Sequence, residues 1–450
     1  MFVRHTRRLT LPLALLLAGT ATAAAAQDVA RMDEVIEAEV ASDGFMGSAL
    51  VAKDGKILLD QGYGSADLGW DIPNASDTKF RIGSVTKQFT GVSILLLMEQ
   101  GKLKLDDPIR QHYPDAPAAW DGITLRHLLH HTSGIPSFTG LDEFTTFKFL
   151  PMTLDEEIAK FRDLPLEFTP GEKFNYSNSG YVLLGAVIER ASGQSYGEFV
   201  KANIFEPLGM ENTGMDSNSA IIPRKATGYA PGKDGIVRAE YVNMDIPHGA
   251  GALYSTTGDL LKWQRGLFGG KLLKPDSLKQ YLTPALSKYA LGVVIDKDDG
   301  GRLYSHSGGI EGFNSWLAYD PDRKITVAVL ANLNGPAANK IGKQLLTLAR
   351  GEEITLAAER EEITLEASQL AEYEGIFALA PTFKIEFFVD GDQLKTQATN
   401  QPVFPVFAEA KDKFFLKVVD AQLHFNRDED GSIKSVTLLQ GGQVMTGIKE

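Results

Sequence analysis

Two side chains in the first quarter of the chain, Ser84 and Lys87, have the types and spacing needed for nucleophilic catalysis. A serine hydroxyl is a weak nucleophile at neutral pH unless a base lies beside it. Residues three apart share one face of a helix, with Cβ atoms about 5–6 Å apart. A helix that starts at Ser84 would therefore bring the hydroxyl and the amine together, and its N-terminus would add positive potential. The pair predicts an activated serine.

The same pattern occurs a second time, at Ser76-Asp77-Thr78-Lys79, so the flanking sequence has to separate the two. Ser84 opens a long apolar run that extends to Met98 and is followed by Gly101, which predicts a buried helix over 84–100. Ser76 lies in a polar stretch beside Pro73, which is typical of a loop. We therefore expect the nucleophile at Ser84.

Tyr176-Ser177-Asn178 provides a candidate proton shuttle. A tyrosine hydroxyl normally titrates near pH 10, so Tyr176 acts as a base only if a neighbouring positive charge, such as that of Lys87, lowers its pKa. Asn178 either positions a substrate or caps the helix that follows. The pattern is degenerate, because Tyr241-Val242-Asn243 repeats it.

His306-Ser307-Gly308-Gly309 ends a predicted strand and contains the only His-x-Gly sequence in the chain. Glycines at a strand end let a substrate approach the backbone closely. The N–H groups of Gly309 and Ser84 would together form an oxyanion hole. The strand itself would also pair with an extended peptide.

The elements that must position these residues come from both ends of residues 27–350. A hairpin is predicted over 48–62, with Asp54-Gly55 at its turn, and helices near 124–131 and 181–191. Four strands and a closing helix follow, at 291–296, 302–306, 313–319, 325–331 and 337–349. This order predicts an α+β fold, in which one antiparallel sheet receives a helical insert.

The pattern changes after residue 350. The sequence Glu-Glu-Ile-Thr-Leu occurs at 352–356 and again at 361–365, and we interpret residues 351–366 as a linker. From Tyr373 onward, about eight short alternating strands predict a small all-β barrel over 367–450. Within it, Leu423 and Phe425 are expected to face one side, and Gln422 and His424 the other.

Taken together, Ser84-x-x-Lys87, Tyr176-x-Asn178 and His306-x-Gly308 resemble the penicillin-recognising serine hydrolases of the class C β-lactamase type, a group that includes DD-peptidases, D-aminopeptidases and esterases. The flanking segments 80–83, 131–134 and 207–210 are also similar to that family. The resemblance implies the β-lactamase fold over 27–350, an acyl-enzyme on Ser84, proton transfer by Lys87 and Tyr176, and substrate binding by Asn178 and by residues 306–309. The final module resembles the lipocalin-like barrel appended to some of these peptidases.

One departure narrows the expected activity. β-Lactamases of this type carry Lys-Thr-Gly where this chain has His306-Ser307-Gly308. A histidine there is largely neutral near pH 7 and gives no permanent cation for a substrate carboxylate. The resemblance therefore favours a peptidase of the DD-peptidase or D-aminopeptidase kind. The alternatives are a carboxylesterase, a weak β-lactamase or a non-catalytic acylated sensor.

Residues 1–26 have the composition of a secretory signal peptide. Three arginines precede the short apolar stretch 9–18, and three alanines precede Gln27. We expect a periplasmic or secreted protein, without a membrane span after signal cleavage. Since the chain has no cysteine, it has no disulfide and no lipobox.

Charge and histidine spacing limit the partners. The formal charge is −13, and it becomes −16 without the three N-terminal arginines, which argues against nucleic-acid binding. His127 and His131 are four apart but lack the His-Glu-x-x-His pattern, so no metal or cofactor is expected, and the resemblance makes His131 structural.

The expected ligand is a peptide, or a small ester or amide. The barrel would cap the site, mediate homo-oligomers or bind an apolar ligand.

Overall fold

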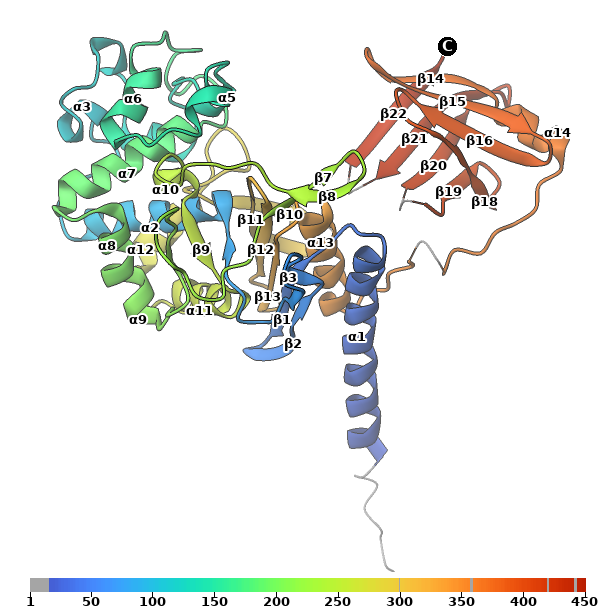
Figure 1. Cartoon of the computed structure of the whole chain (residues 1–450), viewed down its shortest axis with the longest axis horizontal. Helices are drawn as coiled ribbons and strands as arrows, with labels where there is room; N and C mark the ends of the chain where they lie inside the picture. The colour runs from blue at the N-terminus through green and yellow to red at the C-terminus, as the bar shows by residue number, and fades with distance from the viewer. Residues whose placement is uncertain (1–15, 299, 357–358, 419–420, 441–442) are drawn as a thin grey trace, which may run out of the picture. The chain divides into compact units, whose positions relative to one another are not determined.

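A computed structural model describes residues 16–298, 300–356, 359–418, 421–440 and 443–450, with side chains from residue 29 onward except at 298 and 443. The chain divides into two compact units, which meet in sequence between Glu352 and Glu353, at the start of the predicted linker (Figure 1). Each unit is described here by itself.

A six-stranded antiparallel sheet forms the centre of the first unit, in the order β10-β11-β12-β13-β1-β2. The N-terminal hairpin lies beside the last strand of the unit, where Leu50 faces Ala328. The α+β prediction is confirmed: β13 has the predicted bounds, β11 is longer than predicted, and β10 begins three residues later than predicted. Their bounds are β1 Gly47–Lys53, β2 Lys56–Tyr63, β10 Val294–Asp298, β11 Gly301–Ile310, β12 Phe313–Asp320 and β13 Ile325–Ala331.

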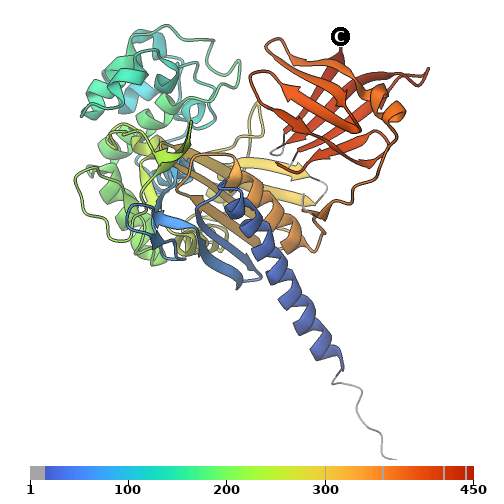
Figure 2. The ribbon, with the colours of Figure 1, turned by 45° about the vertical axis from the view of Figure 1, so that its right-hand side comes forward.

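Helices cover both faces of this sheet. On one face, α13 (Ala337–Arg350) packs against β12 and β13, and α1 (Leu16–Ala41) packs against α13 (Figure 2). A side chain at Gly342 of α13 would collide with the ring of Trp316, so a glycine is required at that contact. On the other face, Leu317 joins the main hydrophobic core. There α11 (Thr257–Phe268) packs against β1 and β13.

The helical insert is built around two buried helices in contact, α2 (Thr86–Glu99) and α7 (Asn178–Ser192). Helix α7 ends at Gly193, whose φ of +77° is the left-handed geometry of a glycine C-cap. The helix expected near 124–131 is shorter, α4 (Leu125–Leu129), capped by Thr124. The remaining helices are α3 Ile109–His112, α5 Phe144–Phe147, α6 Leu154–Arg162, α8 Tyr196–Val200, α9 Glu206–Leu208, α10 His248–Gly251 and α12 Pro275–Tyr281.

Short strands complete the unit: β3 Ser65–Asp67 pairs with β4 Ile72–Pro73, and β7 Tyr229–Gly232 pairs with β8 Gly235–Arg238. A third small sheet joins β5 Phe80–Arg81, β9 Leu253–Ser255 and β6 Gly214–Met215. Strand β5 leads directly to Ser84, so this sheet fixes where the turn before α2 begins.

The second unit is a nearly closed antiparallel barrel of nine strands rather than the eight expected, in the order β17-β16-β15-β14-β22-β21-β20-β19-β18. Val406 alone separates the two strands at the ends of this order. Their bounds are β14 Gly375–Ala380, β15 Phe383–Asp390, β16 Gln393–Ala398, β17 Val403–Pro405, β18 Phe407–Ala410, β19 Lys413–Leu416, β20 Ala421–Arg427, β21 Ile433–Gln440 and β22 Gln443–Lys449, preceded by α14 Ala367–Leu370.

Aromatic rings fill the interior of this barrel. The ring centroid of Phe425 lies 4.9–5.7 Å from those of Tyr373, Phe377, Phe387 and Phe414. Leu423 and Phe425 are buried, whereas Gln422 and His424 are partly exposed, so the predicted alternation along β20 is confirmed. An interior packed in this way is a core, which argues against the apolar-ligand alternative.

The predicted linker contacts the barrel. Ile363 pairs with Ala408, and Lys417 forms an ion pair with Glu362. Residues 353–356 and 359–366 therefore belong to the second unit.

The predicted signal peptide lies partly outside the described residues, which begin at Leu16 within α1. Side chains of α1 that enter the protein include Met32 and Ile36, and the Tyr63 hydroxyl donates a hydrogen bond to Asp33 over 2.8 Å. No helix in the described part of the chain has the length and apolar character needed to cross a bilayer.

Candidate active site

Ser84 lies in a single 3-10 turn, Gly83–Val85, that runs directly into α2. Gly83 has a φ of +50°, and a side chain there would come within 2.8 Å of the Gly309 nitrogen. The absence of a side chain at Gly83 lets the backbone of β11 approach the serine. Ser76 lies in a turn instead, which confirms that the competing pattern is in a loop.

The amine of Lys87 is completely buried beneath Ser84 and contacts three oxygens. Its Nζ lies 3.1 Å from the Ser84 Oγ, 2.8 Å from the Asn178 Oδ1 and 2.8 Å from the Ala250 carbonyl oxygen. Its nearest rings are those of Tyr176 and Tyr181, with centroids 4.8 and 5.5 Å away. No carboxylate forms an ion pair with Lys87 among the described residues.

These contacts suit a neutral amine. Burial lowers the pKa of Lys87 well below its ordinary value. The Asn178 and Ala250 oxygens can only accept, so they take the two N–H bonds of an NH₂ group. The nitrogen lone pair is then directed at the hydroxyl of Ser84. The geometry therefore allows Lys87 to accept the serine proton.

Tyr176 is half-buried, and the pKa of its hydroxyl shifts in the direction opposite to the one expected from the sequence. Burial raises the pKa of its hydroxyl above the ordinary value, and a hydrogen bond with Ser84 offsets only part of this increase. The expectation that Lys87 lowers the pKa of Tyr176 is wrong, because an uncharged amine gives no such stabilisation. Tyr176 is therefore protonated at neutral pH and is suited to donating a proton.

Asn178 is the first residue of α7, but it does not cap the helix with its side chain. Ser177 occupies the capping position. The Asn178 side chain instead accepts from Lys87 and donates from Nδ2 to the Thr139 Oγ1 over 3.0 Å. Because both ends of the amide are bonded, its orientation beside Ser84 is fixed.

His131 contacts the segment that carries Tyr176 and Asn178. It adopts a φ of +57°, and its Nδ1 accepts the Ser177 N–H over 3.1 Å. Its ring lies 4.2 Å from that of Tyr176, centroid to centroid. Burial lowers the pKa of His131 well below its ordinary value. This buried, neutral ring holds the segment that carries Tyr176, consistent with the structural role that the family resemblance implied.

His306 is also buried. Its Nδ1 lies 2.6 Å from the Ser307 carbonyl, so this nitrogen carries the proton, and its Nε2 accepts from the Tyr289 hydroxyl over 2.9 Å. Burial lowers the pKa of His306 to about 3. The expectation of a neutral histidine agrees with this direction.

The four predicted residues of β11 have different surroundings. Ser307 is exposed, and only Gly309 lines the pocket beside Ser84. At Gly308 a side chain would lie 2.1 Å from the Ile82 carbonyl oxygen, so this glycine serves the packing of β11 on the turn before Ser84. Strand β10 pairs with residues 301–305 and β12 with residues 304–310. No strand of the described chain pairs with the second edge of residues 306–310.

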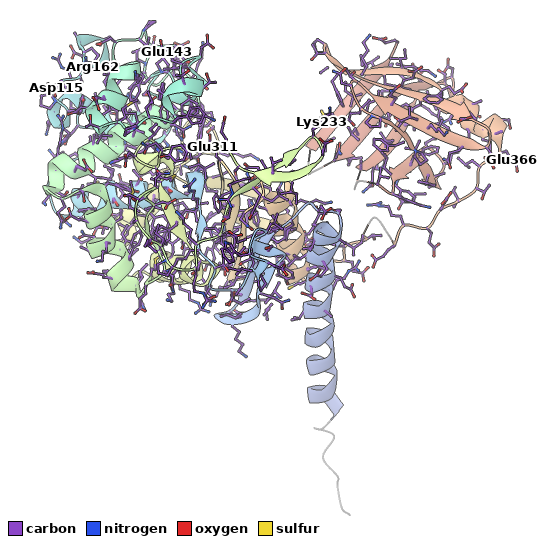
Figure 3. The ribbon with its side chains drawn as sticks, viewed as in Figure 1. Asp115, Glu143, Arg162, Lys233, Glu311 and Glu366 are labelled. Carbon is purple, nitrogen blue, oxygen red and sulfur yellow. The ribbon has the colours of Figure 1, made fainter. Side chains whose placement is uncertain are left out.

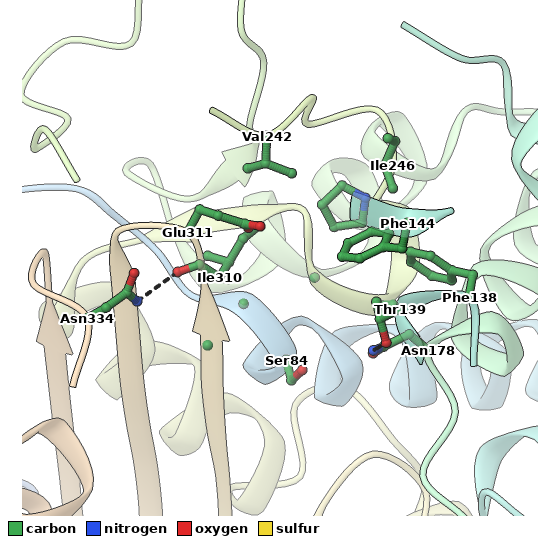
Figure 4. Close-up of a pocket in the computed structure, with 15 residues that line it drawn as sticks. Ser84, Phe138, Thr139, Phe144, Asn178, Val242, Ile246, Ile310, Glu311 and Asn334 are labelled. Carbon is green, nitrogen blue, oxygen red and sulfur yellow. Dashed lines mark hydrogen bonds between the residues drawn. The ribbon is translucent and has the colours of Figure 1, made fainter. Parts of the chain in front are cut away.

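The pocket above Ser84 has a volume of about 470 Å³ (Figure 4). Ser84, Asn178 and Gly309 form its polar floor. Its walls are mostly apolar and include Phe138, Phe144, Val242, Ile246 and Ile310, with Glu311 and Asn334 at one side.

Several residues of this site escaped the sequence interpretation. The Ala250 carbonyl and the Thr139 hydroxyl orient Lys87 and Asn178, and Tyr289 binds His306. The run Pro247-His248-Gly249-Ala250-Gly251 is a signal that could have indicated a close backbone approach. Tyr289 carries no local signal. Among the described residues, no group of three or more His, Cys, Asp or Glu side chains is placed to hold a metal.

Comparison with known families gives two matches. A family model described as Beta-lactamase matches residues 32–350, and a model described as a domain of unknown function, DUF3471, matches residues 359–446. The first match contains the pocket and every predicted site residue.

Three relatives illustrate the similarity. A penicillin-binding protein of Bacillus subtilis (strain 168) is 28% identical over 426 residues, 88% of this chain and 93% of the relative. An octameric penicillin-binding protein homologue from Pyrococcus abyssi aligns over 94% of this chain and 100% of its own, with 30% identity and a TM-score of 0.68. The D-amino acid amidase of Ochrobactrum anthropi SV3, solved with D-phenylalanine, aligns over 72% of this chain and 99% of its own, with 25% identity and a TM-score of 0.64.

Proposed function

This chain belongs to the β-lactamase family, and on that premise we propose that it is an exported serine hydrolase that cleaves amide bonds through an acyl-enzyme on Ser84. The observation that carries the proposal is the buried Lys87 amine, 3.1 Å from the Ser84 Oγ and bonded to two obligate acceptors. Burial of a lysine without a counter-ion lowers the stability of the fold. A role in catalysis would account for this cost.

The reaction begins when the Ser84 Oγ attacks the carbonyl carbon and Lys87 takes the serine proton. The N–H groups of Ser84 and Gly309 stabilise the oxyanion. When the carbon–nitrogen bond breaks, Tyr176 donates its proton to the departing amine and recovers a proton from Lys87. Water then attacks the carbonyl carbon of the ester. Lys87 and Tyr176 accept the proton of that water and pass it to the Ser84 Oγ as the ester bond breaks.

We place the substrate among peptides and aminoacyl amides of the DD-peptidase or D-aminopeptidase kind. Two observations support this class: the neutral His306 where β-lactamases have a lysine, and the similarity to an amidase solved with D-phenylalanine. Small esters are the second candidate, because an acyl-serine mechanism accepts either leaving group.

A substrate panel on the enzyme without residues 1–26 tests the reaction class. It contains D-Ala-D-Ala peptides, D- and L-aminoacyl amides, p-nitrophenyl esters and a chromogenic cephalosporin. Ser84→Ala should abolish every turnover, and Ser76→Ala, the same change in the competing pattern, should leave each rate intact. Activity that survives in Ser84→Ala would overturn the assignment.

A fluorophosphonate label separates an enzyme from an acylated sensor. The enzyme should be labelled on Ser84 and should also turn over at least one amide or ester of the panel. Labelling of Ser84 together with no turnover of any substrate would favour the sensor.

Export is supported by the composition of residues 1–26. N-terminal sequencing of protein from the periplasm or medium should begin at Gln27. Intact protein confined to the cytoplasm would contradict this part of the proposal.

For the second unit we propose self-association. Ile376 on β14 and Val444 and Ile448 on β22 are exposed by 40%, 67% and 56%, and β14 pairs with β22. The similar Pyrococcus abyssi homologue, which extends over both units, is octameric. Light scattering of the full chain should give an oligomeric mass that Val444→Ser with Ile448→Ser reduces. A monomeric wild type would overturn this proposal.

A further inference from the structure

Glu311 is a charged side chain in the pocket wall that has no role in the reaction proposed above. We propose that Glu311 selects substrates whose acyl group carries an ammonium ion, and that it discriminates against those that carry a carboxylate. This inference rests on the proposed function, since it concerns the acyl group held at Ser84.

Glu311 is the only ionisable side chain among the described residues that line the pocket. The other side chains of the lining are apolar, hydroxyl or amide groups. A charged group in apolar surroundings acts more strongly than the same group in water. An acyl group in this pocket therefore meets one fixed charge, and that charge is negative.

The place of Glu311 in the chain puts its carboxylate near the position that we propose for the substrate carbonyl. Glu311 follows Gly309 by two residues, at the turn between β11 and β12 (Figure 3). In Figure 4 its side chain extends from Ile310 toward the wall formed by Phe144, above Ser84. An acyl carbonyl oxygen held at the Gly309 N–H would direct the substituents of its α-carbon into the space between these walls.

The carboxylate is only partly neutralised. The Glu311 Oε1 accepts from the Lys148 Nζ over 3.1 Å, and the same ammonium also bonds to Glu240. Burial opposes the charge of Lys148, but its bonds to the two glutamates outweigh this effect and raise its pKa. Two carboxylates and one ammonium leave a formal charge of −1 on this cluster, and Glu311 keeps further acceptor capacity for a substrate.

The described site offers no cation to a substrate carboxylate. The Lys87 amine is buried and its pKa is lowered, and the pKa of His306 is about 3 with both ring nitrogens already bonded. Lys148 is held by its two glutamates. A carboxylate on the acyl side would therefore face Glu311 without compensation, whereas an ammonium would gain a charge-assisted hydrogen bond.

A series of substrates that share one anilide and differ in the group on the α-nitrogen tests the proposal. Phenylalanine p-nitroanilides of D and L configuration are used with a free amine, an N-acetyl group or an N-succinyl group, which give charges of +1, 0 and −1. For the preferred configuration, kcat/KM should fall in that order at pH 7. The preference for the free amine over the acetyl form should decrease above pH 8, where the substrate amine loses its proton.

Two variants separate recognition from a structural ion pair. Glu311→Gln should reduce the amine-to-acetyl ratio about tenfold, the size expected for one hydrogen bond to a charged group. Lys148→Met leaves both carboxylates without their ammonium and should raise the same ratio. If the bridge is only structural, both variants will change all three rates by a common factor, and that result would overturn the proposal.

A wild-type enzyme that favours the succinyl form, or that shows no charge preference, would also overturn it. Failure of the proposed function looks different, because no substrate of the series or of the earlier panel would then show turnover that depends on Ser84.

Discussion

Two buried ionisable side chains of the first unit, Lys87 and Asp320, are stabilised in opposite ways. Asp320 accepts from the Arg350 guanidinium over 2.8 Å and from the backbone N–H groups of Asp322 and Arg323. Lys87 has only neutral oxygens around it. Neither side chain is exposed to solvent.

The difference shows how the fold assigns a role to a buried charge. The carboxylate of Asp320 is bonded to a guanidinium and two backbone amides, and it links the end of β12 to α13. An amine given two acceptors and a hydroxyl, without a counter-ion, is better accommodated as the neutral base. We therefore expect Asp320 to contribute to stability and Lys87 to the proposed reaction, and the first two predictions test that division.

The largest expected effect is on turnover at Lys87. Lys87→Met keeps the length of the side chain but removes the base, so kcat should fall by about 10³-fold or more. The melting temperature should change little, because relief of the buried amine and loss of its two hydrogen bonds oppose each other. A variant that retains wild-type kcat, or that unfolds before the assay temperature, would break the comparison.

Asp320→Asn should give the reverse result. It weakens the charge-assisted hydrogen bond that the Arg350 guanidinium donates to this side chain, which should lower the free energy of unfolding by about 2 kcal/mol while kcat remains unchanged. All four tryptophans lie in the first unit, so their fluorescence during urea unfolding reports this unit alone. Asp322→Asn, which removes a carboxylate from an exposed pair with Arg302, is the matched control and should cost much less.

Acid should destabilise the first unit through His306. Its pKa is about 3 in the folded protein, against about 6.5 when unfolded, so between these values only the unfolded chain binds the proton. The free energy of unfolding should therefore fall as pH falls from 6.5, by up to about 1.4 kcal/mol per pH unit from this residue. In His306→Asn, tryptophan-detected urea curves between pH 6.5 and 5 should show a shallower decline. An identical slope in both proteins would contradict a neutral His306.

The smallest expected effect concerns the orientation of Asn178. Thr139→Val preserves shape but removes the acceptor of the Asn178 Nδ2, so the amide loses one of the two bonds that direct its oxygen at Lys87. We expect kcat/KM to fall about fivefold, the equivalent of one ordinary hydrogen bond, with stability nearly unchanged. Ser137→Ala is a useful comparison, because Ser137 holds the Asn178 backbone instead of its side chain. Equal losses in kcat/KM and in stability would assign Thr139 a structural role.

Local patterns were sufficient for most of the fold. Strand β13 has the predicted bounds, 325–331, because a short run of mostly β-branched and apolar residues after turn residues favours a buried strand. Strand β11 continues to Ile310, four residues beyond the prediction. Its glycines were interpreted as the end of the strand, whereas they lie within it, where the backbone of residues 82 and 83 comes close. The barrel has one strand more than predicted, because β17 and β18 are separated by a single residue.

The sequence by itself determined the chemistry available at Ser84, since a serine and a lysine three residues apart at the start of a helix must share one face. It also predicted a largely neutral side chain at His306, because the ordinary pKa of a histidine is about 6.5. Only the tertiary structure decided that the Lys87 amine is buried among acceptor oxygens and that burial raises the pKa of Tyr176. The pKa of each group depends on burial and on partners such as Ala250 and Asn178, which lie 163 and 91 residues from Lys87 in the chain. The charge on the pocket wall has the same origin, because Lys148, Glu240 and Glu311 meet only when the chain is folded.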